Sequence, residues 1–270
     1  MTSLPRWTFP FFANVHVGLI AVAWVGSTYG WMQRKPPLSL LVAAFCGASL
    51  VYIADHYARI SPEDRQIHPE RIVWRGQYFH GVTGYSMGLL GVLLVTLPQF
   101  PAAVWAAIAP VAFLSLVYLI PRFRDVLLRL PMLKLVMVVL GWVWGGVILP
   151  ATEMGVTGGN IWLLGLNRLL LISANVWWSH RLDKAGMASL HVFLPSSRLK
   201  KGLYVFLALG MFSSLLQYVW MPVSGGWMEL GGWIGMGLTS RHPETTESYR
   251  WRWDAWAGFP LIGWLLAWIF

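Results

Sequence analysis

Charged residues are scarce in this chain. Only 11% of its 270 residues are Asp, Glu, Lys or Arg, whereas 57% are hydrophobic. Soluble domains usually carry about 25% charged residues, so the composition excludes a domain whose whole surface faces water. No polar stretch is long enough to fold separately, and residues 1–270 are therefore treated as one domain.

Cysteine is almost absent as well. Cys46 is the only one, so an intrachain disulfide is excluded. The chain also lacks the phosphate-binding loops, dinucleotide fingerprints, zinc-ligand clusters and nucleophile elbows that mark many soluble enzymes. Its formal charge of +9 lies in short loops rather than in a basic patch on polar strands or helices. We therefore predict that the protein has no nucleic-acid partner.

Apolar runs of about 20 residues, by contrast, recur from end to end, and each can cross roughly 30 Å of hydrocarbon as a helix. They predict an all-α fold, namely a polytopic membrane bundle of about nine transmembrane helices in a single transmembrane domain. Prolines lie near several span ends, among them Pro98, Pro121 and Pro150. The predicted spans are 12–32, 38–58, 78–98, 101–120, 132–151, 159–178, 202–221, 224–239 and 254–270.

The basic residues are distributed asymmetrically between the two sides of this layout. One side holds seventeen of the twenty Lys and Arg, in the amino-terminal segment and in the loops 59–77, 122–134, 179–201 and 240–253. The other side holds only Arg34 and Lys35, and Arg168 lies within a span. Because cytoplasmic loops are enriched in Lys and Arg, we predict a cytoplasmic amino terminus and an external carboxyl terminus. The expected location is the bilayer of a cytoplasmic membrane, such as the inner membrane of a bacterium.

Two of the cytoplasmic loops open with a cluster of charged residues directly at a helix end. The second span ends with Asp55 and Arg59, and the sixth leads into Arg181, Asp183 and Lys184. Carboxylates at the mouths of two helices can hold a divalent cation, because hard cations prefer oxygen ligands. Such a metal neutralises the charge of a diphosphate leaving group.

This arrangement resembles the UbiA superfamily of intramembrane prenyltransferases. That family has nine spans, with the motif N-x-x-x-D-x-x-x-D after the second and D-x-x-x-D after the sixth. Matching positions in this chain are Val51-x3-Asp55-x3-Arg59, Ser179-x3-Asp183, and further on Gly186 and Phe193-Leu194-Pro195. The chain keeps two of the four family aspartates, and Arg59 stands where an acidic residue is usual.

The resemblance implies a magnesium-dependent transfer of an isoprenyl group from a prenyl diphosphate to a lipophilic acceptor. Asp55 and Asp183 would be the catalytic residues that hold Mg²⁺. Basic side chains would pair with the phosphate oxygens, since Arg is a bidentate donor to phosphate. The substrate-binding residues implied in this way are Arg59, Arg181 and Lys184 at the mouth, with Asn175 and Arg168 deeper in the sixth span.

Two other functions account for the same residues. Asp55 and Arg59 are one helical turn apart and can pair with each other, so the protein can equally be a non-catalytic subunit of a larger membrane complex that binds a lipid, quinone or pigment. Alternatively, charged residues inside a bundle mark a transport path, for which Arg168 and Glu229 are the candidates.

Polar and aromatic residues inside the spans also have two interpretations. Asn167 is expected to form a hydrogen bond between helices, whereas Asn175 lies one turn from Ser179 and is expected near the site. The eighteen tryptophans are expected mainly at the membrane interfaces, with an aromatic lining of an internal cavity as the alternative.

Overall fold

The structure is a computed structural model that describes residues 13–58, 69–120, 123, 131–182, 196–220 and 230–236. These residues form helices and their connections, which confirms the all-α prediction for this part of the chain. The helices are α2 (Val15–Trp31), α3 (Leu38–Ala58), α5 (Pro69–Thr96), η2 (Leu97–Gln99), α6 (Ala102–Leu119), α8 (Pro131–Val143), η3 (Trp144–Ile148), α9 (Leu149–Met154), α10 (Gly159–Leu182) and α12 (Ser196–Trp220).

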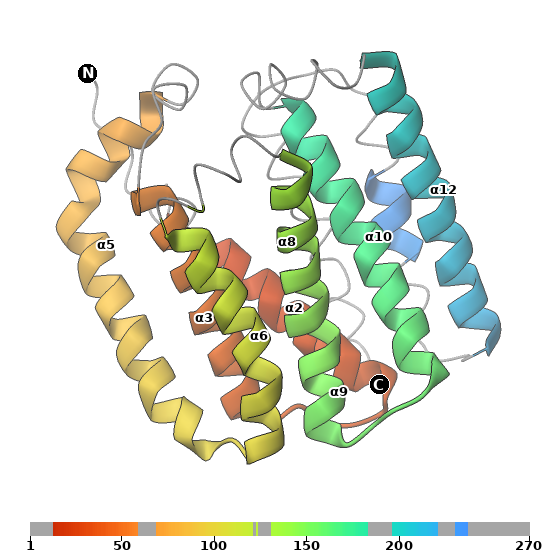
Figure 1. Ribbon diagram of the computed structural model, residues 1–270, viewed down its shortest axis with the longest axis horizontal. Coiled ribbons are helices and arrows are strands. Elements are labelled where there is room, and N and C mark those ends of the chain that lie inside the picture. Colours follow the sequence, from red (N-terminus) through yellow and green to blue (C-terminus); the bar gives the residue numbers. More distant parts are fainter. Residues whose placement is uncertain are drawn as a thin grey trace.

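The long helices run alternately up and down a bundle, with α5 at one edge and α12 at the other (Figure 1). In between, α3 packs on α2 and α5, and α10 packs on α8 and α12. Tight connections join the helices at the lower end of Figure 1, where the chain passes from α2 to α3, from α5 to α6 and from α9 to α10. This alternation is what consecutive spans of one bilayer require, because each crossing reverses the direction of the chain.

Three helical windows in the described part of the chain are long and apolar enough to cross a membrane: Leu38–Asp55, Arg75–Gln99 and Val136–Met154. Large apolar side chains point outward from several helices, for example Val95, Phe113 and Phe212. Apolar patches of this extent are uncommon on soluble monomers and are normal on a surface that faces lipid. Helices occupy the predicted spans from 12–32 to 202–221. The region 224–239 is described as helix only over 230–236, and 254–270 lies outside the described residues.

Two helices begin earlier than the hydropathy pattern predicts. The stretch 59–77 was expected to be a loop, but α5 begins at Pro69 and continues across a kink at Tyr78, where φ is −115° and ψ is 15°. Proline is favoured in the first turn of a helix, where its missing N–H needs no partner. The apolar span predicted from residue 78 is therefore the part of α5 that follows the kink. Likewise α12 begins at Ser196, six residues before its predicted span.

The predicted span 132–151 is interrupted by a π-helical turn, η3, between α8 and α9. Pro150 was expected to end this span but lies at the start of α9, inside the helical run. In a continuous α-helix the carbonyl of Gly146 would accept the N–H of residue 150, which a proline lacks. It accepts the Thr28 hydroxyl of α2 instead, at 2.6 Å.

A second hydrogen bond to a backbone carbonyl lies near another proline. Pro110 lies inside α6, and the indole N–H of Trp144 donates to the carbonyl of Ala107 in the preceding turn, at 2.7 Å. The carbonyl that Pro110 leaves without an α-helical donor is that of Ala106, so the Trp144 bond joins two helices and does not replace the lost bond. The π turn, α2 and α6 are thus joined by hydrogen bonds to backbone carbonyls.

At the lower end of Figure 1, α2 is joined to α9. The Tyr29 hydroxyl donates to the Glu153 carboxylate, and Arg34 Nη1 donates to the carbonyl of Met154 at 2.7 Å. Tyr29 is only 1% exposed. These bonds fix the end of the helical run α8–α9 against the end of α2.

Candidate functional site

The carboxyl ends of α3 and α10 lie at the same end of the bundle, the upper end in Figure 1. These are the two helix ends that carry the charged motifs. Asp55 lies in the last turn of α3 and is partly buried. Arg181 belongs to the last turn of α10, three residues beyond the predicted end of that span. Arg59, Asp183 and Lys184 lie outside the described residues.

An arginine that was predicted to lie in the loop 59–77 also lies at this end. The guanidinium carbon of Arg75, on α5, is 5.3 Å from the centre of the Tyr57 ring on α3. Arginine over an aromatic face is an attractive cation–π contact. Arg75 is thereby held against Tyr57, which follows Asp55 by two residues in the sequence. No pattern in the sequence indicated this pairing.

Arg168 lies in the middle of α10 and is completely buried. Its Nη2 donates to the Ser27 hydroxyl of α2 at 2.7 Å. Its guanidinium carbon lies 4.9 Å from the centre of the Trp24 ring. A charged hydrogen bond is worth about 1.5–3 kcal/mol and a desolvated cation–π contact about 2 kcal/mol. Together these are comparable with the roughly 2.5–3.5 kcal/mol cost of Arg at the centre of a membrane helix, so the two α2 side chains help to hold the arginine inside the bundle.

The neighbouring residue on α10 belongs to a second buried polar group. Asn167 Nδ2 donates to the Ser214 hydroxyl of α12 at 3.0 Å, and the Trp233 indole N–H donates to Asn167 Oδ1 at 3.0 Å. The prediction that Asn167 forms a hydrogen bond between helices is therefore confirmed. Asn175, two turns further along α10, is 8% exposed and belongs to the buried part of that helix.

A row of aromatic rings connects the end of α3 with Arg168. The Trp142 indole N–H on α8 donates to the Tyr52 hydroxyl on α3 at 3.0 Å. The rings of Trp142 and Trp24 meet edge to face, with centroids 5.6 Å apart. Trp24 in turn lies beneath the Arg168 guanidinium. Tyr52 is one turn before Asp55, so the row leads from the charged mouth to the centre of the bundle.

Only an indirect signal in the sequence indicates this row. Trp24 lies well inside its predicted span rather than at an end, which separates it from tryptophans of the interface. Its partners on α8 and α10 follow from the way the helices pack, and no spacing within the chain encodes them. Trp24 and Trp142 therefore lie in the packed interior of the bundle, and the predicted aromatic lining of a cavity stays a prediction.

The magnesium prediction remains a prediction. Within the residues that the structure describes, no three His, Cys, Asp or Glu side chains come together as a metal-binding group. Asp55 belongs to this part of the chain, whereas its predicted partner Asp183 lies outside it. The transport hypothesis also stays a prediction. Arg168 lies on α10 with no exposed surface and donates to Ser27 of α2, whereas Glu229 lies outside the described residues.

Comparison with known proteins gives no relative for this chain. No protein-family model matches it, and neither a curated protein nor a solved structure shows significant similarity to it. The function is therefore argued from the site alone.

Proposed function

We propose that the protein is an integral membrane prenyltransferase similar to the UbiA superfamily, whose cytoplasmic mouth binds a prenyl diphosphate. One observation carries this proposal. Two helix ends with charged motifs lie at the same end of the bundle, and from one of them the aromatic row Tyr52–Trp142–Trp24 leads inward. A prenyl diphosphate has an anionic head, which suits the charged helix ends, and an apolar tail, which suits the aromatic row.

In this proposal the diphosphate lies at the mouth and the isoprenyl chain follows the aromatic row. Asp55 and Asp183 would hold a divalent metal, which would neutralise the charge of the diphosphate, and Arg59, Arg181 and Lys184 would pair with phosphate oxygens. Arg75 adds a further cation beside the end of α3. Electron-rich ring faces stabilise positive charge, which supports the formation of an allylic cation next to Tyr52 and Trp142. Asn175 and Arg168 lie deeper on α10.

A second function has an observation of its own. Arg59 occupies the position of an acidic residue in the family motif and is one turn from Asp55, so the two can pair and leave no metal site. The same bundle then binds an isoprenoid lipid, quinone or pigment without reacting with it, as a subunit of a membrane complex.

The test measures binding of tritiated geranylgeranyl diphosphate to purified protein by scintillation proximity, with and without Mg²⁺. Asp55→Asn and Asp183→Asn are the test variants. Glu153→Gln is the matched control, because this acid lies at the opposite end of the bundle. Binding that requires Mg²⁺ and both aspartates, but not Glu153, supports prenyl transfer. Binding that ignores the metal and the aspartates favours the non-catalytic subunit, and no binding at all contradicts prenyl transfer.

A further inference from the structure

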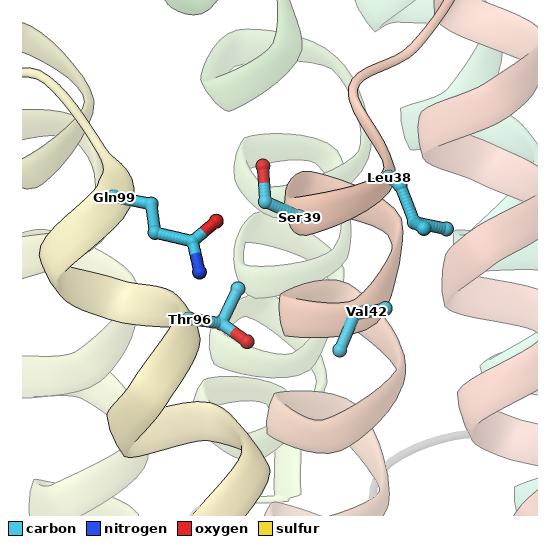
Figure 2. Close-up of a pocket in the computed structure, with 5 residues that line it drawn as sticks. All are labelled: Leu38, Ser39, Val42, Thr96 and Gln99. Atoms are coloured by element: carbon cyan, nitrogen blue, oxygen red, sulfur yellow. The ribbon is translucent and has the colours of Figure 1, made fainter.

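A second surface feature lies at the other end of the bundle from the charged motifs. A hollow of about 440 Å³ separates the start of α3 from the end of α5 and the following η2 turn. Its lining residues are Leu38, Ser39, Val42, Thr96 and Gln99. Figure 2 shows the α3 residues on one wall and Thr96 and Gln99 on the other.

The polar groups of the lining face one another across this hollow. The Gln99 carboxamide points toward the α3 wall, where Ser39 lies (Figure 2). One N–H of the Gln99 amide donates to the carbonyl of Val95 at 3.3 Å, and the amide carries a second N–H. The Thr96 hydroxyl donates to the carbonyl of Val92 at 2.7 Å. The hollow therefore offers an amide N–H and the Ser39 hydroxyl to a ligand that accepts hydrogen bonds.

Among the residues that the structure describes, the lining contains no charged side chain and no aromatic ring. A phosphate would find no cation in it, and a quinone or pigment ring would find no ring to stack on. Leu38, in the lining, is 75% exposed, and Val95, which precedes Thr96 in the sequence, is 72% exposed. A ligand suited to this surface combines neutral hydrogen-bond acceptors with alkyl chains.

The position of the hollow across the membrane narrows the choice of ligand further. Leu38 and Gln99 are terminal residues of two of the helical windows that can cross a membrane. The window Leu38–Asp55 has 18 residues and is roughly 27 Å long at 1.5 Å per residue, close to the roughly 30 Å of the hydrocarbon layer. The hollow thus lies where the hydrocarbon layer ends, which is the level of the ester groups of membrane lipids.

We propose that this hollow binds the glycerol–ester region of a diacyl phospholipid from the outer leaflet. The ester carbonyls accept hydrogen bonds from Gln99 and Ser39, and the acyl chains lie over Leu38, Val42 and the exposed apolar residues at the end of α5. This site is separate from the prenyl diphosphate mouth and does not depend on the function proposed for it.

The experiment compares two lipids that differ only in the proposed acceptors. Delipidated protein in detergent is mixed with a phosphatidylglycerol that has ester-linked chains, or with its diether analogue of the same head group and chain length. Native mass spectrometry then measures the bound fraction of each lipid. Because one hydrogen bond contributes a factor of about two to ten in affinity, the wild-type protein should retain the diester lipid about two- to tenfold more strongly.

Variants test whether the preference for the diester lipid arises in the hollow. Gln99→Leu and Ser39→Ala should each reduce the preference for the diester lipid about twofold or more, whereas Gln77→Leu should keep it, since Gln77 is an exposed glutamine of α5 outside the hollow. Equal retention of both lipids by the wild type overturns the proposal. A preference that survives both Gln99→Leu and Ser39→Ala also overturns it, because the esters are then bound elsewhere. If Gln99→Leu does not fold, Ser39→Ala decides alone.

Discussion

Replacing Gly210 with alanine tests how the helical residues 230–236 pack against α12. A Cβ atom at Gly210 would overlap the indole ring of the completely buried Trp233. The ring cannot shift without losing its hydrogen bond to Asn167 on α10. The methyl group therefore has no room, although alanine is otherwise a better helix former than glycine.

The two effects have opposite signs and known sizes. Overpacking a well-packed core costs about 1–3 kcal/mol, and a locked ring places Gly210→Ala at the upper end, about 3 kcal/mol. The gain in helix propensity is about 0.5–1 kcal/mol. We expect a net loss of about 2 kcal/mol, or roughly 4–8 °C in Tm for a chain of this size.

A matched control changes only the helix propensity. A Cβ atom at Gly88, inside α5, would meet no atom within 4 Å, so Gly88→Ala should stabilise the protein by about 0.5–1 kcal/mol. Thermal unfolding in detergent can be followed with a thiol-reactive fluorescent maleimide, because Cys46 is the only cysteine and is buried.

Combining the change with Trp233→Leu makes the test specific. In that background the indole is gone, and Gly210→Ala should become neutral or stabilising. If Gly210→Ala raises the Tm of the wild-type protein as Gly88→Ala does, the packing of Trp233 on α12 described above is wrong.

The remaining predictions use the same unfolding assay. Arg168→Lys should destabilise the protein by about 1–3 kcal/mol, since a lysine keeps the buried charge but not the planar fork; an unchanged Tm would refute the contribution of these contacts. Thr28→Val should cost about 1–3 kcal/mol because it leaves the Gly146 carbonyl buried without its donor, whereas Thr152→Val, whose hydroxyl bonds within its own helical run, should change stability by less than about 0.5 kcal/mol. Trp144→Phe should cost about 0.5–1.5 kcal/mol, the net worth of one hydrogen bond, and an unchanged Tm would contradict a stabilising role for this bond.

The helical spans were predictable because an apolar run of sufficient length has one stable form in a bilayer. α3 begins and ends at the predicted residues, 38 and 58. Hydropathy could not predict the kink at Tyr78 or the π turn, because it records how apolar a stretch is and not how its backbone hydrogen bonds are arranged. Pro150 was a visible signal, but on its own it indicates an end of a helix as readily as an interruption.

The candidate site was predictable only in part. Asp55 and the motif at the end of α10 were located from charge at span ends, and these ends lie on the same side of the bundle. The partners of Arg168 were not predictable, since Ser27 and Trp24 belong to a helix that is distant in sequence. Their proximity depends on the order in which helices pack, and neither composition nor spacing contains that order.

The π turn η3 also determines which side chains of α9 face α2. A π turn contains one residue more than an α-helical turn, and one residue of an α-helix corresponds to about 100° of rotation. Deleting a single residue from 144–148 would restore a regular helix and turn everything after it by that angle. Glu153 would then point away from Tyr29, and the Met154 carbonyl away from Arg34. The extra residue of the π turn therefore sets the rotation of α9 about its own axis, so that one face of α9 meets α2. Related chains should accordingly tolerate substitutions in this turn more readily than a change in its length.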